Sequence, residues 1–267
     1  MCLILFLYNQ HPGYRLILAA NRDEFYDRPT TPMAFWDDAP DVLAGRDLKG
    51  SGTWLGITKN GRIAAITNFR EPDRFKPDAP SRGLLISNYL TGTETPKIYL
   101  KHIKPTGHRY NGFNLILGDE SGLYYYSNKA DKIKELKPGL YGLSNHLLDT
   151  PWPKVENGKA GLKKLLTGKN QINTEDIFSL LADRTFAPDD RLPDTGIGVK
   201  WERILSPMFI TSDTYGTRSS SIILIDKNRK ASFTERSFTP EKLGSIKQKT
   251  RRFNLILAGN YPATMDL

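Results

Sequence analysis

The sequence predicts an α+β domain built from antiparallel sheets that are covered by helices. Short apolar runs joined by turn signals lie near both ends of the chain, and the centre carries apolar residues at helical spacing. Strands and helices do not alternate along the chain, as a doubly wound parallel sheet would require. No internal repeat or change in composition divides the chain, so residues 1–267 are expected to form a single domain.

The first quarter of the chain predicts two hairpins. Leu3–Tyr8 and Arg15–Ala20 are apolar runs separated by a His-Pro-Gly turn. Thr53–Thr58 and Arg62–Thr67 surround an Asn-Gly pair, which is a strong hairpin signal. Between the hairpins, residues 21–49 are polar and rich in turn-forming residues, and this predicts a long functional loop.

The remaining predicted elements place helices in the centre and strands at the C-terminal end. Polar, Pro- and Gly-rich residues 183–202 predict a mobile loop between them. In chain order we expect a helix over 81–90 with Ser81 as its N-cap, a hairpin of 113–117 and 123–127, a strand over 139–143, helices over 155–166 and 174–182, and strands over 208–211, 219–226 and 231–238.

The charge balance is strongly basic, with 38 Lys and Arg residues against 29 Asp and Glu residues. A net charge of +9 can attract anionic ligands, nucleic acid or membrane surfaces. The densest basic runs are 154–169 and 242–252. The first carries three leucines at helical spacing and predicts a surface helix with a solvated basic face. No aromatic-interleaved RNA motif or zinc finger accompanies it, so nucleic acid is not an expected partner.

The compartment is indicated by cysteine usage and by the lack of long apolar segments. One cysteine excludes an intramolecular disulfide, which favours a reducing environment. No stretch approaches the length of a transmembrane span. We therefore expect a cytoplasmic protein.

Several common functional motifs are not satisfied. Gly45–Gly56 is rich in glycine but matches neither phosphate-binding glycine motif. Gly142–His146 resembles the G-x-S-x-G nucleophile elbow, but a histidine stands where the last glycine is needed. The four histidines share no metal-ligand spacing, so no metal site is expected; they are His11, His102, His108 and His146.

Cys2 is the first candidate for catalysis. Methionine aminopeptidase removes Met1 when the next side chain is small, and this would leave a thiol and a free α-amine on one residue. The amine has a reference pKa of roughly 7.7–8.0 and the thiol about 8.5, so the amine could accept the thiol proton. The alternative interpretation is a small apolar residue that happens to begin a strand.

Polar clusters at strand ends could complete a site around Cys2. The first hairpin should return Asn21–Glu24 to the start of the chain, where a carboxylate could orient the α-amine and Arg22 could lower the thiol pKa. Asn68 and Asn145 could supply an oxyanion hole, although asparagines in such positions are also common turn formers. Arg218 could steady a thiolate or bind a substrate anion.

At these residues the chain resembles the NRDE-motif family, also called the transport and Golgi organisation family. The resemblance covers essentially the whole chain and is distantly shared with cysteine Ntn hydrolases of the bile-salt hydrolase and penicillin V acylase group. It implies an αββα sandwich and cleavage of a non-peptide C–N amide, or acyl transfer. The matching motifs are Met1–Leu3, Asn21–Glu24, Gly45–Asp47, Gly52–Gly56, Thr67–Arg70, Gly142–Lys154 and Tyr215–Arg218.

The resemblance also implies a role for particular residues. Cys2 matches the nucleophile and Arg218 a late arginine, while Asn68 and Asn145 match the oxyanion-hole segments. In the hydrolases the early arginine and aspartate are separated by two residues, whereas Arg22 and Asp23 are adjacent. Either Asp23 or Glu24 could therefore hold the α-amine.

Two functions follow as hypotheses. The first is an N-terminal cysteine amidohydrolase or acyltransferase that needs no cofactor and acts on a small acylated molecule, with a substrate pocket formed by Glu24, Trp54, Phe69, Trp152 and Tyr215. The second is a non-catalytic haem or lipid binding or transfer protein on the same fold. Animal members of the family are associated with haem trafficking and lipid homeostasis. Haem would need an axial ligand such as Cys2 or a histidine.

Overall fold

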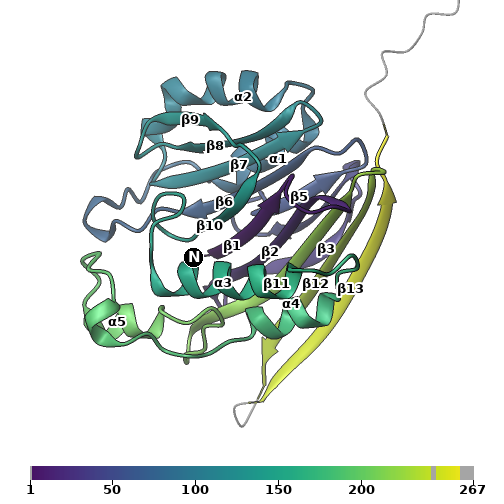
Figure 1. Cartoon of the computed structure of the whole chain (residues 1–267). Coiled ribbons are helices and arrows are strands. Elements are labelled where there is room, and N and C mark those ends of the chain that lie inside the picture. Colours follow the sequence, from purple (N-terminus) through teal and green to yellow (C-terminus); the bar gives the residue numbers. More distant parts are fainter. Residues whose placement is uncertain (1, 242–244, 259–267) are drawn as a thin grey trace, which may run out of the picture.

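Two antiparallel β-sheets face each other, and helices cover the outer face of each sheet (Figure 1). The computed structural model describes residues 2–241 and 245–258. This four-layer arrangement confirms the α+β class and the αββα sandwich predicted from the sequence and its resemblance.

The first sheet has six strands in the order β10-β1-β2-β11-β12-β13. It joins the N-terminal hairpin to the C-terminal strands, because β2 pairs with β11 along most of its length. Its strands are β1 (Cys2–Tyr8), β2 (Tyr14–Phe25), β10 (Gly139–Leu143), β11 (Tyr215–Asp226), β12 (Lys230–Pro240) and β13 (Ile246–Ile256).

The second sheet has seven strands in chain order from β3 to β9. Each strand pairs with the next one, so the sheet is a meander that is interrupted between β6 and β7 by helices. Its strands are β3 (Thr30–Trp36), β4 (Ala39–Asp47), β5 (Leu55–Thr58), β6 (Ile63–Asn68), β7 (Phe113–Asp119), β8 (Gly122–Ser127) and β9 (Lys132–Glu135).

Alternation along the strands separates three buried layers. On β1, Ile4 and Phe6 point between the sheets, whereas Leu3 and Leu5 point to the helices on the other face, because successive side chains of a strand face opposite ways. All four are fully buried. β1 therefore reads as a continuous apolar run, which is typical of a strand covered on both faces.

Helices cover the sheets through their own apolar faces. α1 (Gly83–Thr91) and α2 (Pro96–Ile103) pack on the second sheet around Tyr89. α3 (Pro153–Leu166) and α4 (Thr174–Leu181) pack on the first sheet, with α5 (Val199–Ile204) beyond them. Three short 3-10 segments complete the described elements, at Pro72–Arg74, Lys104–Arg109 and Asp189–Arg191.

The prediction of a long loop over residues 21–49 is wrong. β2 continues through the Asn21–Glu24 cluster to Phe25, and β3 and β4 follow. The polar residues of this stretch are compatible with strands because several of them line a cleft rather than the core. Turn-forming composition therefore misled the prediction.

The C-terminal third also differs from expectation. Residues 183–198 are irregular apart from a 3-10 turn at Asp189–Arg191, which agrees with the predicted loop, but α5 begins inside the predicted range and Glu202 is buried. Residues 208–211 form only an isolated bridge between Thr211 and Gly216, although Met208–Ile210 are buried as a strand would be. β13, in the basic run 242–252, was not predicted because its charged residues hide the apolar alternation; of that run, 242–244 lie outside the described residues.

The helix over 81–90 begins later than predicted. Its first residue is Gly83, and Ser81 contributes its backbone carbonyl to Leu84 N at 3.3 Å rather than a side-chain cap. The start of this helix packs against Gly52, where no side chain fits: a Cβ on Gly52 would lie 2.3 Å from the Gly83 carbonyl carbon. The two backbones thus approach more closely than any side chain would allow.

Candidate active site

Cys2 lies at the first position of β1, opposite Arg22 of β2. It is 7% exposed and is part of the wall of a cleft of about 1010 Å³ between the two sheets. Burial raises the pKa of the thiol, while the Arg22 guanidinium and the Asp23 backbone N–H, which bonds to the sulfur, lower it. The Asp23 carboxylate adds to the rise, and the lowering groups do not reverse it, so the buried sulfur is held in its thiol form.

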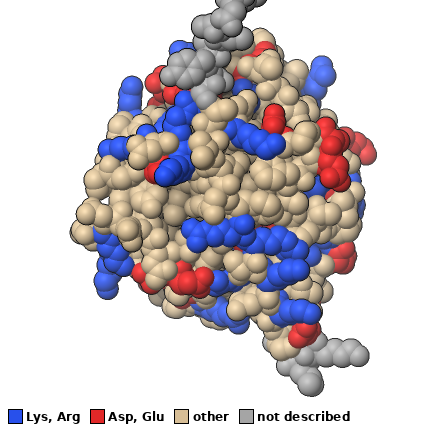
Figure 2. Space-filling model, turned by 90° about the vertical axis from the view of Figure 1, so that its right-hand side faces the viewer, with Lys and Arg blue, Asp and Glu red and all other residues tan. Residues whose placement is uncertain are grey.

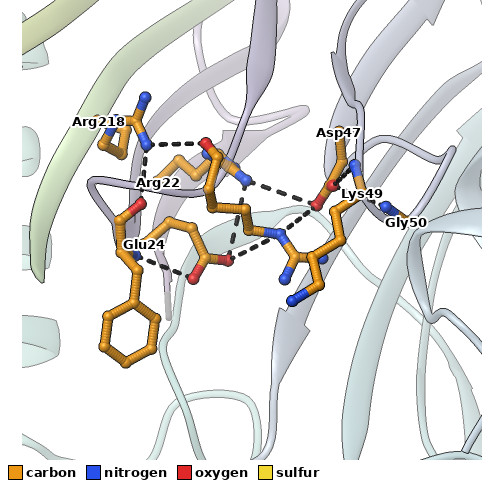
Figure 3. Close-up of polar contacts among 8 residues, drawn as sticks. Arg22, Glu24, Asp47, Lys49, Gly50 and Arg218 are labelled. Atoms are coloured by element: carbon orange, nitrogen blue, oxygen red, sulfur yellow. Dashed lines mark hydrogen bonds and ion pairs between the residues drawn. The ribbon is translucent and has the colours of Figure 1, made fainter.

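Arg22 and Glu24 point to the same side of β2 as Cys2 and enter a charge network with β4 (Figure 3). Arg22 Nη2 lies 3.8 Å from both Glu24 Oε2 and Asp47 Oδ2, and Arg28 Nε donates to Asp47 Oδ2 at 2.7 Å. The other oxygen of Asp47 accepts from the backbone of Gly50 at 2.9 Å. The two arginines and two carboxylates therefore largely balance one another beside Cys2.

Asp23 points to the opposite face of the sheet, toward the helices. Its Oδ1 accepts from Thr217 Oγ1 at 2.7 Å, and the side chain is 1% exposed. Burial raises the Asp23 pKa, against the lowering effects of the Lys154 ammonium and the Thr217 hydroxyl. Because Cys2 pairs with Arg22, Asp23 stands at the next position, beside the backbone nitrogen of Cys2.

Lys154 is the basic partner of this second face. Its Nζ donates to Leu205 O at 3.0 Å from the first turn of α3, and the residue is 4% exposed. Burial lowers the Lys154 pKa to about 8, and the Asp23 carboxylate acts against that shift. A buried ammonium and a buried carboxylate therefore flank the start of β1 on the side away from the cleft.

The Asn21 side chain of the same cluster has a structural role. Its Nδ2 donates to Leu181 O and to Met208 O, both at 2.8 Å, and Ser220 Oγ donates to its Oδ1 at 2.6 Å. The buried Asn21 amide thereby supplies a hydrogen bond to the carbonyl of the last residue of α4 and joins β2 to β11.

Asn68 and Asn145 are adjacent, but their side chains differ in access. Asn68 is half-buried at the end of β6 and lines the cleft. Asn145 is fully buried outside the cleft lining, and its Nδ2 donates to Asn68 O at 3.0 Å. Ser144 Oγ lies 3.1 Å from Cys2 O and 3.2 Å from Asn145 Oδ1, so its single proton can serve either oxygen. This chain of contacts links the Cys2 backbone to Asn68.

Arg218 lines the cleft at a β-bulge between Thr217 and Ser219. Its Nη1 donates to Phe25 O at 2.8 Å and to Arg28 O at 3.1 Å, which fastens the turn between β2 and β3 (Figure 3). Burial lowers the Arg218 pKa, and the nearby Arg22 adds to the shift. The guanidinium thus borders the cleft while its contacts are to backbone carbonyls.

Only part of the expected substrate pocket lies in the cleft. Glu24 and Trp54 line it, but Phe69, Trp152 and Tyr215 do not. Phe69 packs on His146 at 4.8 Å between ring centroids, and Tyr215 packs on Phe25 at 5.1 Å. Trp152 belongs to the buried layer under α3. The apolar part of the cleft comes instead from Ile66, Phe75 and Phe238, together with Pro32, Pro77 and Pro80.

Comparison with known proteins identifies the chain's relatives. The family model described as Transport and Golgi organisation 2 matches residues 1–240. The chain belongs to the Transport and Golgi organisation 2 family. The Transport and Golgi organization 2 homolog of Mus musculus is 38% identical over 275 residues, covering 96% of this chain and 99% of that protein. The Homo sapiens homolog is 37% identical over the same shares of both chains.

A solved structure shows that this member of the Transport and Golgi organisation 2 family shares the Ntn-hydrolase fold. A mutant of the conjugated bile acid hydrolase from Clostridium perfringens superposes with a TM-score of 0.50, over 98% of this chain and 99% of that chain, at 11% identity. Within the described residues, no helix is long and apolar enough to cross a membrane.

Several residues of the candidate site in this family member were not identified from its sequence. Lys154 is the last residue of the Gly142–Lys154 motif and Asp47 the last residue of the Gly45–Asp47 motif. Their place in these two motifs is the sequence feature that could have indicated them. Arg28 carries no such signal, because its importance depends on the tertiary contact with Asp47. The cleft-lining residues of β13 lie in a basic run that was noted without a role; they are Lys247, Lys249 and Arg251.

Proposed function

We propose that this protein is an N-terminal cysteine amidohydrolase or acyltransferase that acts on an amide of a small acylated molecule. The observation that carries the proposal is the position of the chain's only cysteine. Cys2 lies in the wall of a large cleft, where the Asp23 backbone N–H bonds to its sulfur and the Arg22 guanidinium acts to lower its pKa against the effect of burial. The cleft volume matches the range of small-molecule sites.

The proposed reaction begins once Met1 has been removed. The α-amine of Cys2 takes the thiol proton, with the adjacent Asp23 carboxylate holding the resulting ammonium. The thiolate attacks the carbonyl carbon of the amide, which forms a C–S bond and a tetrahedral oxyanion. The ammonium then returns its proton to the leaving amine as the C–N bond breaks. Water, or a second amine in transfer, resolves the thioester and regenerates the thiol.

Asp23 is the better candidate for orienting the amine, and Glu24 for the wall of the substrate pocket. Glu24 Oε2 faces Arg22 and Arg28, and its Oε1 accepts from Phe25 N at 3.0 Å. Asp23 instead faces away from the cleft beside the Cys2 backbone nitrogen. The register of β1 and β2 therefore supports Asp23 in that role.

Asn68 is the proposed oxyanion donor, and Asn145 is proposed to position it. Asn68 shares the cleft with Cys2, whereas Asn145 donates to the Asn68 carbonyl from a buried site. Loss of one oxyanion donor costs about 10²–10³ in kcat. An Asn68→Ala variant should therefore bind substrate and turn it over slowly.

The first test is the intact mass of the mature protein. Loss of the Met1 mass is required, since a retained methionine leaves no α-amine on Cys2 and refutes the mechanism. A thiol-directed electrophile offers the second test, and its interpretation is simple because the chain has one cysteine. We expect Cys2 to label faster than a cysteine in an unfolded peptide, and Asp23→Asn to change the pH dependence of that rate. Slow labelling in the folded protein would count against an activated nucleophile.

The haem or lipid carrier has less support from the site. A haem iron would need an axial ligand such as a cysteine or a histidine. Among the described residues that line the cleft, Cys2 is the one cysteine and there is no histidine. A haem titration that shifts the Soret band in the native protein and not in Cys2→Ala would favour this alternative over catalysis.

A further inference from the structure

The cleft that holds Cys2 has an uneven distribution of charge. Nine of its lining residues are Lys or Arg and four are Asp or Glu, and one of those four, Asp23, turns its carboxylate to the other face of the sheet. Figure 2 shows the face of the molecule that carries β13: Lys and Arg side chains gather in a band across it, and most Asp and Glu side chains lie toward its edges. The question is which of these cations are already neutralised by the protein.

The inner cations are held by other groups of the protein. Arg22 and Arg28 face Glu24 and Asp47, as described above, and Arg46 Nη2 donates to Asp38 Oδ1 at 2.9 Å. Two further arginines of the lining donate to backbone carbonyls: Arg82 Nη1 to Gly112 O at 2.9 Å, and Arg218 to two carbonyls. The carbonyls hold Arg82 and Arg218 in place without cancelling their charge, so among these inner cations Arg22, Arg28 and Arg46 are the ones balanced by carboxylates.

The outer cations have no such partners. Within residues 2–241 and 245–258, the side chains of Lys49, Lys247, Lys249 and Arg251 make no hydrogen bond or ion pair. Lys49 contributes its backbone N–H to Asp47, and its ammonium remains available. Glu235, the acidic residue of the lining near Arg251, accepts from Met33 N at 2.8 Å and is buried. The rim of the cleft therefore has an excess of positive charge.

The strand geometry turns three of these cations into an ordered row. On β13, Phe253 and Leu255 pack on the core between the sheets. Side chains two residues apart share a face, so Lys247, Lys249 and Arg251 continue that inner face over the cleft, and all three line it. Their spacing is about 6.8 Å from one to the next and about 14 Å over the row.

We propose that this row on β13, together with Lys49, is a binding site for the polyanionic part of the cleft's ligand, a molecule with two or more oxyanion groups several ångströms apart. A single carboxylate is too small to bridge neighbouring members of the row, whereas linked oxyanions can contact two or three of them at once. The apolar side chains of the cleft wall, buried Ile66 and Phe238 and exposed Phe75, would receive the remainder of the same ligand.

The site is defined independently of Cys2 chemistry, and its test uses binding alone. Isothermal titration calorimetry at low salt, with the full chain and pyrophosphate as the probe, should give saturable binding that weakens with added NaCl. Inorganic phosphate should bind more weakly and acetate more weakly still. The Cys2→Ala variant should bind pyrophosphate as the native chain does, so failure of the proposed catalysis would leave this result unchanged.

The matched variants compare the two faces of one strand. Lys249→Gln and Arg252→Gln each remove one positive charge from β13, but Arg252 is exposed on the outer face and does not line the cleft. We expect Lys249→Gln to weaken pyrophosphate binding several-fold and the triple variant Lys247→Gln/Lys249→Gln/Arg251→Gln to weaken it by at least about tenfold. Arg252→Gln should leave it within about twofold.

Three outcomes would overturn the proposal. These are the absence of saturable pyrophosphate binding to the native chain, equal losses in Lys249→Gln and Arg252→Gln, and phosphate binding as tightly as pyrophosphate. Since the substituted side chains are solvent-facing or half-buried on an edge strand, circular dichroism of each variant should match the native protein.

Discussion

The buried ion pair between Arg70 and Glu202 provides a quantitative test of the structure beneath the candidate site. Arg70 Nη1 donates to Glu202 Oε2 at 2.5 Å, and the two side chains are 6% and 3% exposed. Glu202 Oε1 also accepts from Thr195 N at 2.9 Å. Burial lowers the pKa of Arg70, and the Glu202 carboxylate is the main group acting against that shift.

We predict that Glu202→Gln lowers the free energy of unfolding by about 3–5 kcal/mol, because it removes the carboxylate that faces the buried Arg70 charge. In a chain of this size, that corresponds to a fall in Tm of roughly 6–20 °C. Urea denaturation followed by tryptophan fluorescence measures the change, and Arg70→Met/Glu202→Leu should lose less stability than Glu202→Gln because it removes both charges.

The exposed pair of Arg203 and Asp189 is the matched control. Arg203 Nη2 and Asp189 Oδ2 also lie 2.5 Å apart, but their side chains are 46% and 57% exposed. Water screens such a pair, so Asp189→Asn should lower the unfolding free energy far less than Glu202→Gln does. Equal losses for Glu202→Gln and Asp189→Asn would refute the reasoning, since distance alone would then determine the effect.

Three further predictions address the framework of the site. Burial holds the pKa of Lys154 at about 8, below its value of 10.5 in an unfolded chain, so the unfolded state binds more protons between pH 8 and pH 10.5. The free energy of unfolding should therefore rise with pH over this range. Measured by urea denaturation against Lys154→Met, which lacks the titrating group, the rise should reach about 3 kcal/mol. Gly52→Ala should lower the unfolding free energy by about 1–3 kcal/mol, since its Cβ would overlap the Gly83 backbone. Tyr125→Phe should cost about 1–3 kcal/mol, because Tyr125 OH donates to buried Asn114 Oδ1 at 2.8 Å.

Each of these has a contradicting result. A difference between native and Lys154→Met stability that stays flat from pH 8 to pH 10 would contradict the lowered pKa. Gly13→Ala is the control for Gly52, because the nearest atoms to its added Cβ lie 3.8 Å away, and a similar loss at both glycines would exclude steric overlap as the cause. An unchanged Tyr125→Phe midpoint would mean that Asn114 finds another donor.

The N-terminal hairpin illustrates what can be read from the chain directly. Apolar runs and turn residues act over short distances, so Leu3–Tyr8, the Asn-Gly hairpin and the strand over 139–143 were all predicted close to their observed bounds. The return of a hairpin also places Asn21–Glu24 beside Cys2 without further information. The face on which each of these side chains points follows from the register, and a shift of one residue reverses it.

Strands rich in polar residues were missed for one physical reason. Residues 21–49 and β13 carry charges where a buried strand would carry apolar residues, and such charges normally indicate loops. In the folded chain these side chains line the cleft, where they meet each other or face open space. Local pattern therefore fails where a strand serves a site instead of the core.

The sequence by itself determined the fold class, the family and the grouping of Cys2, Arg22, Asp23 and Asn68, because short-range periodicity and motif order are encoded locally. Only the tertiary structure decided that Asp23 faces Lys154 while Arg22 faces the cleft, that Asn145 supports Asn68 from behind, and that the row on β13 overhangs the opening. These contacts join residues more than 75 positions apart in the chain. They depend on how two sheets pack and which face each strand presents, and no local pattern carries that information.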